Sequence, residues 1–296
     1  MKNEKSRFRL IDGLLIAMMV APLVIAMVIK IMIQPASEGI TITGALVLLT
    51  IPMPVMDMLI TEAQVNSWLV MVSIVGLCLF LTHGMKVQGG TRRQLIAEWC
   101  VEKIDNLVES NMDPVYHKTY PAFVGSIMAL SVFSSLMSLL GLFPPTSDVN
   151  VVAGWGVLVF ILITKAKLTL GPLYYAKGFL EPIPVMLPMN LIGEIATPVS
   201  MTFRHFGNVL SGSVVSALVA WALAGLSSTL LGWLPGVLGE VPFLQIGIPA
   251  VLSAYFDVFS GCIQAFIFAM MTMFNVSGGY PSEEIAARRA KAAMAK

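Results

Sequence analysis

One apolar stretch decides the architecture of this chain: VMLPMNLIGEIATPVSMTFRHFGNVLSGSVVSALVAWALAGL, Val185–Leu226. As a single α-helix it would extend for about 60 Å at about 1.5 Å per residue, or about twice the hydrocarbon thickness of a bilayer. Such a helix must tilt steeply, break, or lie partly along the membrane. Pro198, Gly207 and Gly212 are positions where it can bend.

The composition of the whole chain is that of a membrane protein. Of the 296 residues, 57% are hydrophobic and 12% are charged, whereas a soluble domain carries about 25% charged residues. The mean hydropathy is +0.83. The three cysteines, Cys78, Cys100 and Cys262, have no spacing that suggests a metal site or a disulfide framework. We therefore expect an integral membrane protein with no metal, no cofactor and no nucleic-acid partner.

Apolar runs long enough for a membrane crossing, about 20 residues, recur along the chain. The predicted crossings are Ile11–Ile33, Ser67–Met85, Tyr120–Leu142, Val149–Ile163, Ile183–Leu231 and Phe243–Asn275. The sequence thus predicts an all-α integral membrane fold with about six crossings. The last two would form a long, steeply tilted two-helix hairpin near the C-terminus.

The basic residues indicate how these crossings are oriented. They precede the first crossing, separate the second from the third, and follow the fourth and the last: Lys2, Lys5, Arg7, Arg9, Lys86, Arg92, Arg93, Lys103, Lys118, Lys165, Lys167, Lys177, Arg288, Arg289, Lys291 and Lys296. With both termini in the cytoplasm, all of them lie inside, as the positive-inside rule requires. Lys30 can snorkel to the outer interface, which leaves Arg204 as the one basic residue without an interfacial explanation.

Two segments allow more than one interpretation. The apolar run of the first crossing exceeds the roughly 7–15 residues of a signal-peptide core, which favours a signal anchor, with cleavage near QPASEG (34–39) as the alternative. The segment TRRQLIAEWCVEKIDNLVESNMD (91–113) has apolar residues at helical spacing with charges between them. It predicts an amphipathic helix, either on the inner membrane surface or in a solvated loop.

Polar residues form a stripe along the long apolar stretch. At about 100° per residue, one helix face carries Ser200, Arg204, Asn208 and Ser211, with Asn190 near it, Glu194 about a quarter turn away and Ser213 on the opposite side. The last crossing has a second stripe, made of Ser253, Asp257, Ser260 and Gln264.

The charges in these stripes are costly to hold in a membrane, at about 2.5–3.5 kcal/mol each on insertion scales, and such residues are usually functional. A plainer alternative is an ion pair of Arg204 with Asp257 or Glu194 that only locks two helices. A secondary ion-coupled transporter is a further alternative, because transporters also carry charges at the membrane midplane. We expect His205 to be a packing or hydrogen-bonding residue.

Several separate motifs resemble those of one family, subunit a of the F-type ATP synthase. The segment PMNLIGEIATPVSMTFRHFGNVLSG (188–212) is similar to the family signature, and AYFDVFSGCIQAFIFAMMTM (254–273) resembles its final helix. The segments ITEAQVNSWLVMV (60–72) and GLFPPTSDVNV (141–151) also resemble family segments. The resemblance covers about Ile60 to Val276. It implies a subunit-a-like ion-translocating domain over 51–296, preceded at 1–50 by a basic segment and an extra crossing.

The resemblance implies a stator that is not itself catalytic, in a prokaryotic plasma membrane. Its partners would be a rotating ring of c subunits, the peripheral-stalk b subunits, the rest of the ATP synthase and the bilayer. Ions, either H⁺ or Na⁺, would reach a carboxylate on each c subunit through an outer half-channel and leave through an inner one. Arg204 would match the stator arginine, which stays charged because its pKa exceeds about 12, and would act as an electrostatic latch and a barrier to leakage.

The same resemblance assigns the other candidate residues. Asn208 matches the asparagine that follows the arginine, and Gln264 matches the glutamine of the final helix. Asp257 and Ser213 are implied to belong to the outer half-channel, and Asn190 and Glu194 to the inner one. Ser213 departs from the family pattern, since many bacterial relatives carry an acid there, and we expect Asp257 to supply the acidic group instead.

Overall fold

The structure is a computed structural model that describes residues 2–33, 44–54, 57–87, 91–169, 171–180, 183–231, 244 and 247–278. The chain divides into two compact units. Unit 1 comprises Met1–Ala97, Ala129–Val151 and Phe206–Ala265, and unit 2 comprises Glu98–Met128, Val152–His205 and Phe266–Lys296. The boundaries fall inside helices, so several helices contribute residues to both units.

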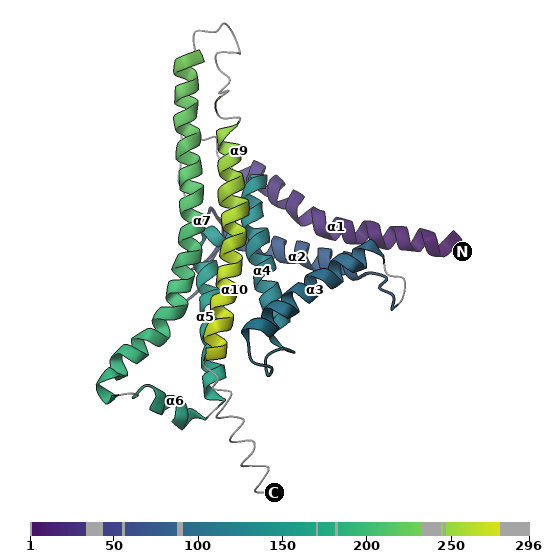
Figure 1. The fold of residues 1–296 in the computed structure, drawn as a ribbon. Helices are drawn as coiled ribbons and strands as arrows, with labels where there is room; N and C mark the ends of the chain where they lie inside the picture. The colour runs from purple at the N-terminus through teal and green to yellow at the C-terminus, as the bar shows by residue number, and fades with distance from the viewer. Residues whose placement is uncertain are drawn as a thin grey trace. The chain divides into compact units, whose positions relative to one another are not determined.

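Helices dominate the described chain (Figure 1). The α-helices are α1 (Lys2–Ile33), α2 (Glu62–Thr82), α3 (Arg92–Asn111), α4 (Tyr120–Leu136), α5 (Val149–Leu168), α6 (Pro172–Gly178), α7 (Leu187–Leu231), α9 (Ile248–Ser253) and α10 (Gly261–Gly278). Three 3-10 turns are η1 (Met137–Leu140), η2 (Pro145–Ser147) and η3 (Pro184–Met186), and η5 (Ala254–Ser260) is a π-helix.

Six helical segments among the described residues are long and apolar enough to cross a membrane. They are Leu10–Ile33, Glu62–Thr82, Tyr120–Leu140, Val149–Leu168, Pro184–Leu230 and Ile248–Gly278. This confirms the predicted all-α fold with six crossings. The long apolar stretch folds as α7, which is helical without a break although Pro198 lies inside it. The steep tilt predicted for the C-terminal hairpin stays a prediction.

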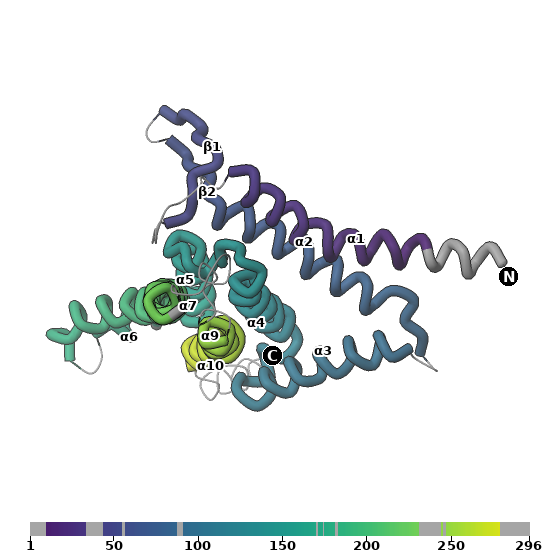
Figure 2. Tube along the Cα trace, turned by 90° about the horizontal axis from the view of Figure 1, so that it is seen from above, coloured from purple at the N-terminus to yellow at the C-terminus, as the bar shows by residue number. Residues whose placement is uncertain are grey.

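Within unit 1, α1 lies along α2 (Figure 2). A Cβ atom on Gly76 would lie 2.9 Å from the backbone nitrogen of Met19, so glycine permits the close approach of the two helices. The Ser73 hydroxyl donates to the Met19 carbonyl oxygen at 2.6 Å, and the Lys30 ammonium group donates to the Gly141 carbonyl oxygen. Helix α1 is therefore part of the packed unit, while the cleavage alternative near QPASEG falls outside the described residues.

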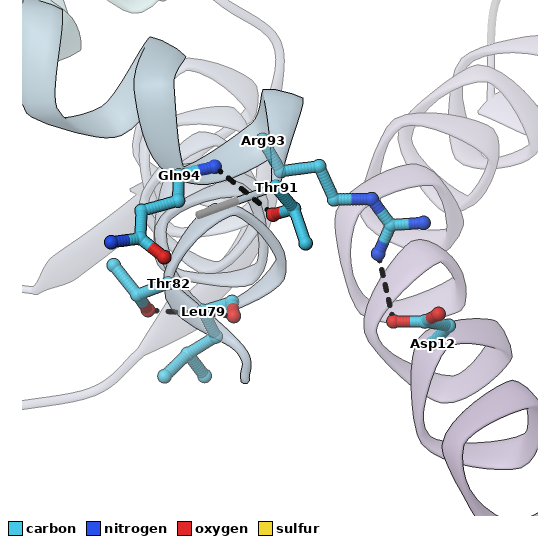
Figure 3. Close-up of polar contacts among 6 residues, drawn as sticks. All are labelled: Asp12, Leu79, Thr82, Thr91, Arg93 and Gln94. Atoms are coloured by element: carbon cyan, nitrogen blue, oxygen red, sulfur yellow. Dashed lines mark hydrogen bonds and ion pairs between the residues drawn. The ribbon is translucent and has the colours of Figure 1, made fainter. Parts of the chain in front are cut away.

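The start of α3 is tied to α1 by an ion pair (Figure 3). Arg93 Nη1 lies 2.9 Å from Asp12 Oδ1, and the guanidinium carbon lies 4.1 Å from the centre of the Phe80 ring, within cation–π range. Thr91 Oγ1 accepts a hydrogen bond from the backbone N–H of Gln94 at 3.4 Å and so caps the helix. The helix predicted over 91–113 is confirmed, and its position at the membrane surface stays a prediction.

A β-hairpin precedes α2 and was not predicted. Strands β1 (Val47–Ile51) and β2 (Met58–Thr61) pair antiparallel, with Ile51 opposite Met58. The Glu62 N–H donates to the Leu46 carbonyl oxygen at 2.8 Å, which joins the hairpin to α2. Periodicity missed these strands because a short apolar run of four or five residues fits a strand and a helix equally well.

The core of unit 2 is built from α3, α4, α5, α7 and α10. Its fully buried residues include Val108, Val124, Val159, Ala269 and Met273. Glycine again allows helices to approach, because a Cβ on Gly125 would lie 2.9 Å from Ile104 Cδ1. This core fixes the inward face of α7, where Met201 is 4% exposed, and so determines which α7 residues face outward.

Candidate functional site

The polar stripe predicted on α7 faces outward. The side chains of Ser200, Arg204, Asn208 and Ser211 are all exposed. Within the described ranges, the Arg204 side chain makes no hydrogen bond and no ion pair. The helical projection from the sequence is confirmed, and it places a permanent positive charge on an outward face of a membrane-spanning helix.

The opposite face of α7 is packed, and it contains His205. This side chain is fully buried, and its ring centre lies 5.6 Å from those of Trp155 and Phe268 in edge-to-face contacts. The sequence placed His205 beside the charged residue, but one helical step of about 100° turns it into the core. The expectation that His205 is a packing residue is confirmed.

A close helix contact in unit 2 holds this face of α7 in place. A Cβ on Gly156 of α5 would lie 3.3 Å from the Pro198 carbonyl oxygen and would also collide with the Thr202 hydroxyl. That hydroxyl donates to the same Pro198 carbonyl at 2.9 Å. Gly156 thus lets α5 pack directly against the proline-containing turn of α7.

Glu194 makes an ion pair, and its partner is Lys167. Lys167 Nζ lies 2.5 Å from Glu194 Oε2, and the two side chains are 31% and 10% exposed. The Tyr175 hydroxyl lies 3.5 Å from the other carboxylate oxygen. The alternative in which Arg204 is locked to Glu194 is therefore wrong, because the nearest cation to that carboxylate comes from the last turn of α5.

The residues around Glu194 form the inner group of the candidate site. Burial, and then the negative charge of Glu194, raise the pKa of the Tyr175 phenol, against the smaller effect of a hydrogen bond with Thr164. Tyr175 therefore stays protonated and can donate to the carboxylate. Asn190 uses its amide to donate to the Phe179 carbonyl oxygen at 3.0 Å, which fixes the entry to α7.

Asp257 lies in unit 1, inside the π-helix η5. The hydroxyls of Ser253 and Ser138 are within hydrogen-bonding reach of its carboxylate. Phe256, the residue before it, faces Gly212 of α7, where a Cβ would lie 3.1 Å from Phe256 Cβ. Asp257 is thus held between its own helix and the 3-10 turn that follows α4, and the described residues give it no cationic partner.

The segment that carries the second predicted stripe contains a π-helix. Residues 254–260 form this π-helix, which is wider and turns less per residue than the regular α-helix that the projection assumed. Ser253, Asp257 and Ser260 are partly buried and Gln264 is buried, and the Ser253 hydroxyl lies within hydrogen-bonding reach of Asp257. The placement of Ser253, Asp257, Ser260 and Gln264 on a single face stays a prediction.

Helix α4 brings further hydroxyl groups to this part of unit 1. A Cβ on Gly261 would lie 2.6 Å from Ser135 Cβ, so α10 begins in direct contact with α4. Ser134 and Ser135 are buried, and within the described residues their hydroxyls have no hydrogen-bond partner. An unpaired buried hydroxyl costs about 1–3 kcal/mol, so these serines are unusual residues for a packed helix contact.

The Ser213 hydroxyl bonds to its own helix rather than to this group. It donates to the Leu210 carbonyl oxygen at 2.8 Å. The candidate site includes residues that the sequence did not suggest, among them Lys167, Tyr175 and Ser138. Lys167 had been assigned to the interface by charge alone, and Ser138 is one of several serines in an apolar run, so neither carried a distinguishing signal.

The fold and the sequence motifs define a class of protein: a multi-pass membrane protein with an outward-facing arginine and further polar side chains in its membrane-spanning helices. A family model described as ATP synthase A chain matches residues 64–277. The chain belongs to this family, and it serves as the ion-conducting stator subunit in the membrane part of an ATP synthase.

Known relatives agree with this assignment. The chain is 28% identical over 242 residues to "ATP synthase subunit a, sodium ion specific" of Propionigenium modestum, covering 76% of each chain. It is 31% identical over 229 residues to ATP synthase subunit a of Lysinibacillus sphaericus, covering 72% of this chain and 89% of the relative. The subunit of Bacillus subtilis is 29% identical over 218 residues, covering 68% and 84%. The protein is thus a multi-pass bacterial membrane protein, and the family favours the stator over a secondary transporter.

Proposed function

We propose that Arg204 is the latch of this stator and pairs in turn with the carboxylate that each c subunit presents. The observation that supports this is the outward-facing, unpaired guanidinium group in apolar surroundings. A membrane-embedded charge without an internal partner needs an external one. The positive charge of Arg204 would favour the ionised form of a rotor carboxylate beside it. Arg204 would not release its own proton to that carboxylate.

Ions reach that carboxylate from outside through the group around Asp257. Asp257, Ser138 and Ser253 supply carboxylate and hydroxyl oxygens, and the buried hydroxyls of Ser134 and Ser135 extend this set along α4. We also assign Gln264 and Ser213 to the outer half-channel, because they occupy the positions of its residues in the family. Oxygen ligands suit Na⁺, and the relative from Propionigenium modestum is named as sodium ion specific, so Na⁺ is the first ion to test beside H⁺.

Ions leave to the cytoplasm past Glu194, Asn190 and Tyr175. The ion pair between Lys167 and Glu194 acts as a charged gate at this inner end. Because Glu194 pairs with Lys167, its carboxylate does not pair with Arg204. Asn208, one turn beyond Arg204 on the exposed stripe, shares the face toward the ring.

The remaining assignments follow from the same proposal. Both termini lie in the cytoplasm, residues 51–296 form the ion-translocating part, and residues 1–50 add a retained membrane helix. The chain contacts the c-ring directly and the peripheral-stalk b subunits elsewhere, and ATP chemistry takes place in other subunits.

The test is coupled transport by the assembled complex in inverted vesicles. Arg204→Ala should abolish both ATP-driven ion uptake and ion-driven ATP synthesis, while Arg204→Lys should retain only a small part of them. Measurements with and without Na⁺ distinguish the ion. Coupled transport at the wild-type rate by a fully assembled Arg204→Ala complex would refute the proposal.

A further inference from the structure

A cavity of about 330 Å³ lies in unit 2, and none of the candidate site residues described above lines it. The turn that precedes α4 forms one wall through Tyr116 and Thr119, and the first turn of α4 adds Tyr120 and Phe123. The end of α5 forms the opposite wall through Leu162 and Lys165. The volume is within the range of about 300–1,000 Å³ that is usual for small-molecule sites.

The cavity is polar at one end and apolar at the other. Helix α4 begins at Tyr120, and α5 ends at Leu168, three residues after Lys165. Phe123 and Leu162 therefore lie about 4.5 Å deeper along their helices than Tyr120 and Lys165. The shallow end holds hydroxyl groups and an ammonium group, and the deep end holds hydrocarbon. An amphiphile fits this order, whereas a free inorganic anion would leave the deep end empty.

The polar groups at the shallow end are available to a ligand. In the described part of the chain, the side chains of Lys165, Tyr120 and Thr119 make no hydrogen bond or ion pair. Lys167, two residues further on, is already paired with Glu194. Of these two lysines at the end of α5, Lys165 is therefore the one that can bind an anion from outside the chain.

Aromatic rings make this wall of the cavity rigid. The ring centres of Tyr116 and Tyr120 are 4.8 Å apart, and those of Tyr120 and Phe123 are 6.3 Å apart, both in edge-to-face contact. Tyr116 is 8% exposed and belongs to the core of unit 2. The wall is therefore preformed, and a ligand would not have to order it.

We propose that this cavity binds one anionic phospholipid of the leaflet on the lysine-rich side of the membrane. Its phosphate accepts hydrogen bonds from Lys165, Tyr120 and Thr119, and the first part of an acyl chain lies against Phe123 and Leu162. Basic pockets between spanning helices on the cytoplasmic side are suited to such head groups, and tyrosines favour this depth of the membrane. A peptide side chain with a carboxylate would match Lys165 but would not require the apolar deep end.

The probe is a phosphatidylglycerol with a photoactivatable group on its acyl chain, added to the delipidated ATP synthase complex in detergent. Labelled peptides are mapped by mass spectrometry. We expect labelling of the segments 115–123 and 162–169, competed by unlabelled phosphatidylglycerol but by neither phosphatidylcholine nor inorganic phosphate. Lys165→Gln should weaken binding about fivefold, which corresponds to about 1 kcal/mol.

Lys118→Gln is the matched control, because Lys118 is an exposed lysine of the turn that precedes α4, next to Thr119, and does not line the cavity. It should leave the labelling unchanged. Phe123→Trp fills the deep end of the cavity and should abolish the labelling in a complex that still assembles. Equal labelling of wild type and Lys165→Gln would overturn the proposal, as would competition by phosphatidylcholine or by inorganic phosphate. Labelling that appears only after another subunit is removed would indicate a protein occupant and would overturn it too.

Discussion

Two charged residues on one helix, Glu194 and Arg204, have opposite surroundings. Glu194 is largely buried and paired with Lys167 from α5. Arg204 is exposed and, among the described residues, unpaired. The chain satisfies the first charge internally and presents the second to its environment. Of two charges that looked equally costly in the sequence, one therefore has a local structural role and the other needs a partner that this chain does not contain.

The largest expected effect is the loss of transport on removal of Arg204, without a loss of folding. Arg204→Ala should reduce coupled transport at least about 100-fold, since removing one partner of a buried charge pair costs about 3–5 kcal/mol. The apparent unfolding temperature of the detergent-solubilised subunit by itself should stay unchanged, because the Arg204 side chain makes no hydrogen bond or ion pair with the described residues. A marked fall in that temperature would mean that Arg204 is structural after all.

For Lys167, in contrast, we expect a substitution to reduce the stability of the protein. Lys167→Gln leaves the Glu194 carboxylate buried without its cation, and we expect a loss of about 1–3 kcal/mol, below the value for a fully buried pair because Lys167 is 31% exposed. Thermal unfolding in detergent measures it.

The double variant Lys167→Gln/Glu194→Gln should recover at least half of this loss, since neither partner is then charged. Lys177→Gln, an exposed lysine of α6, is the control and should have no effect. If the single and double variants were equally unstable, the ion pair would not be the cause.

The packed face of α7 can be tested with a matched pair of glycines on α5. Gly156→Ala should destabilise the protein by about 1–3 kcal/mol through overpacking against Thr202 and Pro198. A Cβ on Gly154 meets nothing within 4 Å, so Gly154→Ala should be tolerated. Equal unfolding temperatures for the two variants would contradict the close helix contact.

The smallest effect concerns Tyr175. Its pKa is raised in the folded protein, above the usual value of about 10. Between these two values the folded state keeps a proton that the unfolded state has lost, so stability should fall as the pH rises through this interval. Phenol absorbance should give a titration above pH 10 that is missing in Tyr175→Phe, and a midpoint at or below the usual value would disagree with the burial beside Glu194.

Most of the fold was predictable because the signals for it are local. Six apolar runs gave six helices, and the helix over 91–113 followed from its spacing. The β-hairpin and α6 were missed because short segments carry no decisive periodicity. The π-helix around Asp257 was missed for a related reason, since a change in helical pitch leaves no trace in residue spacing.

Hydropathy and helical periodicity were enough to predict the membrane class, the number of crossings and the polar face that carries Arg204, because both depend on neighbouring residues. Tertiary structure alone decided that Glu194 pairs with Lys167, that His205 packs between Trp155 and Phe268, and that Ser138 lies near Asp257. Each of these contacts joins segments that are distant in the chain. Glycines such as Gly156 and Gly261 allow helices to pack closely, and spacing within one segment cannot reveal which side chains another helix brings.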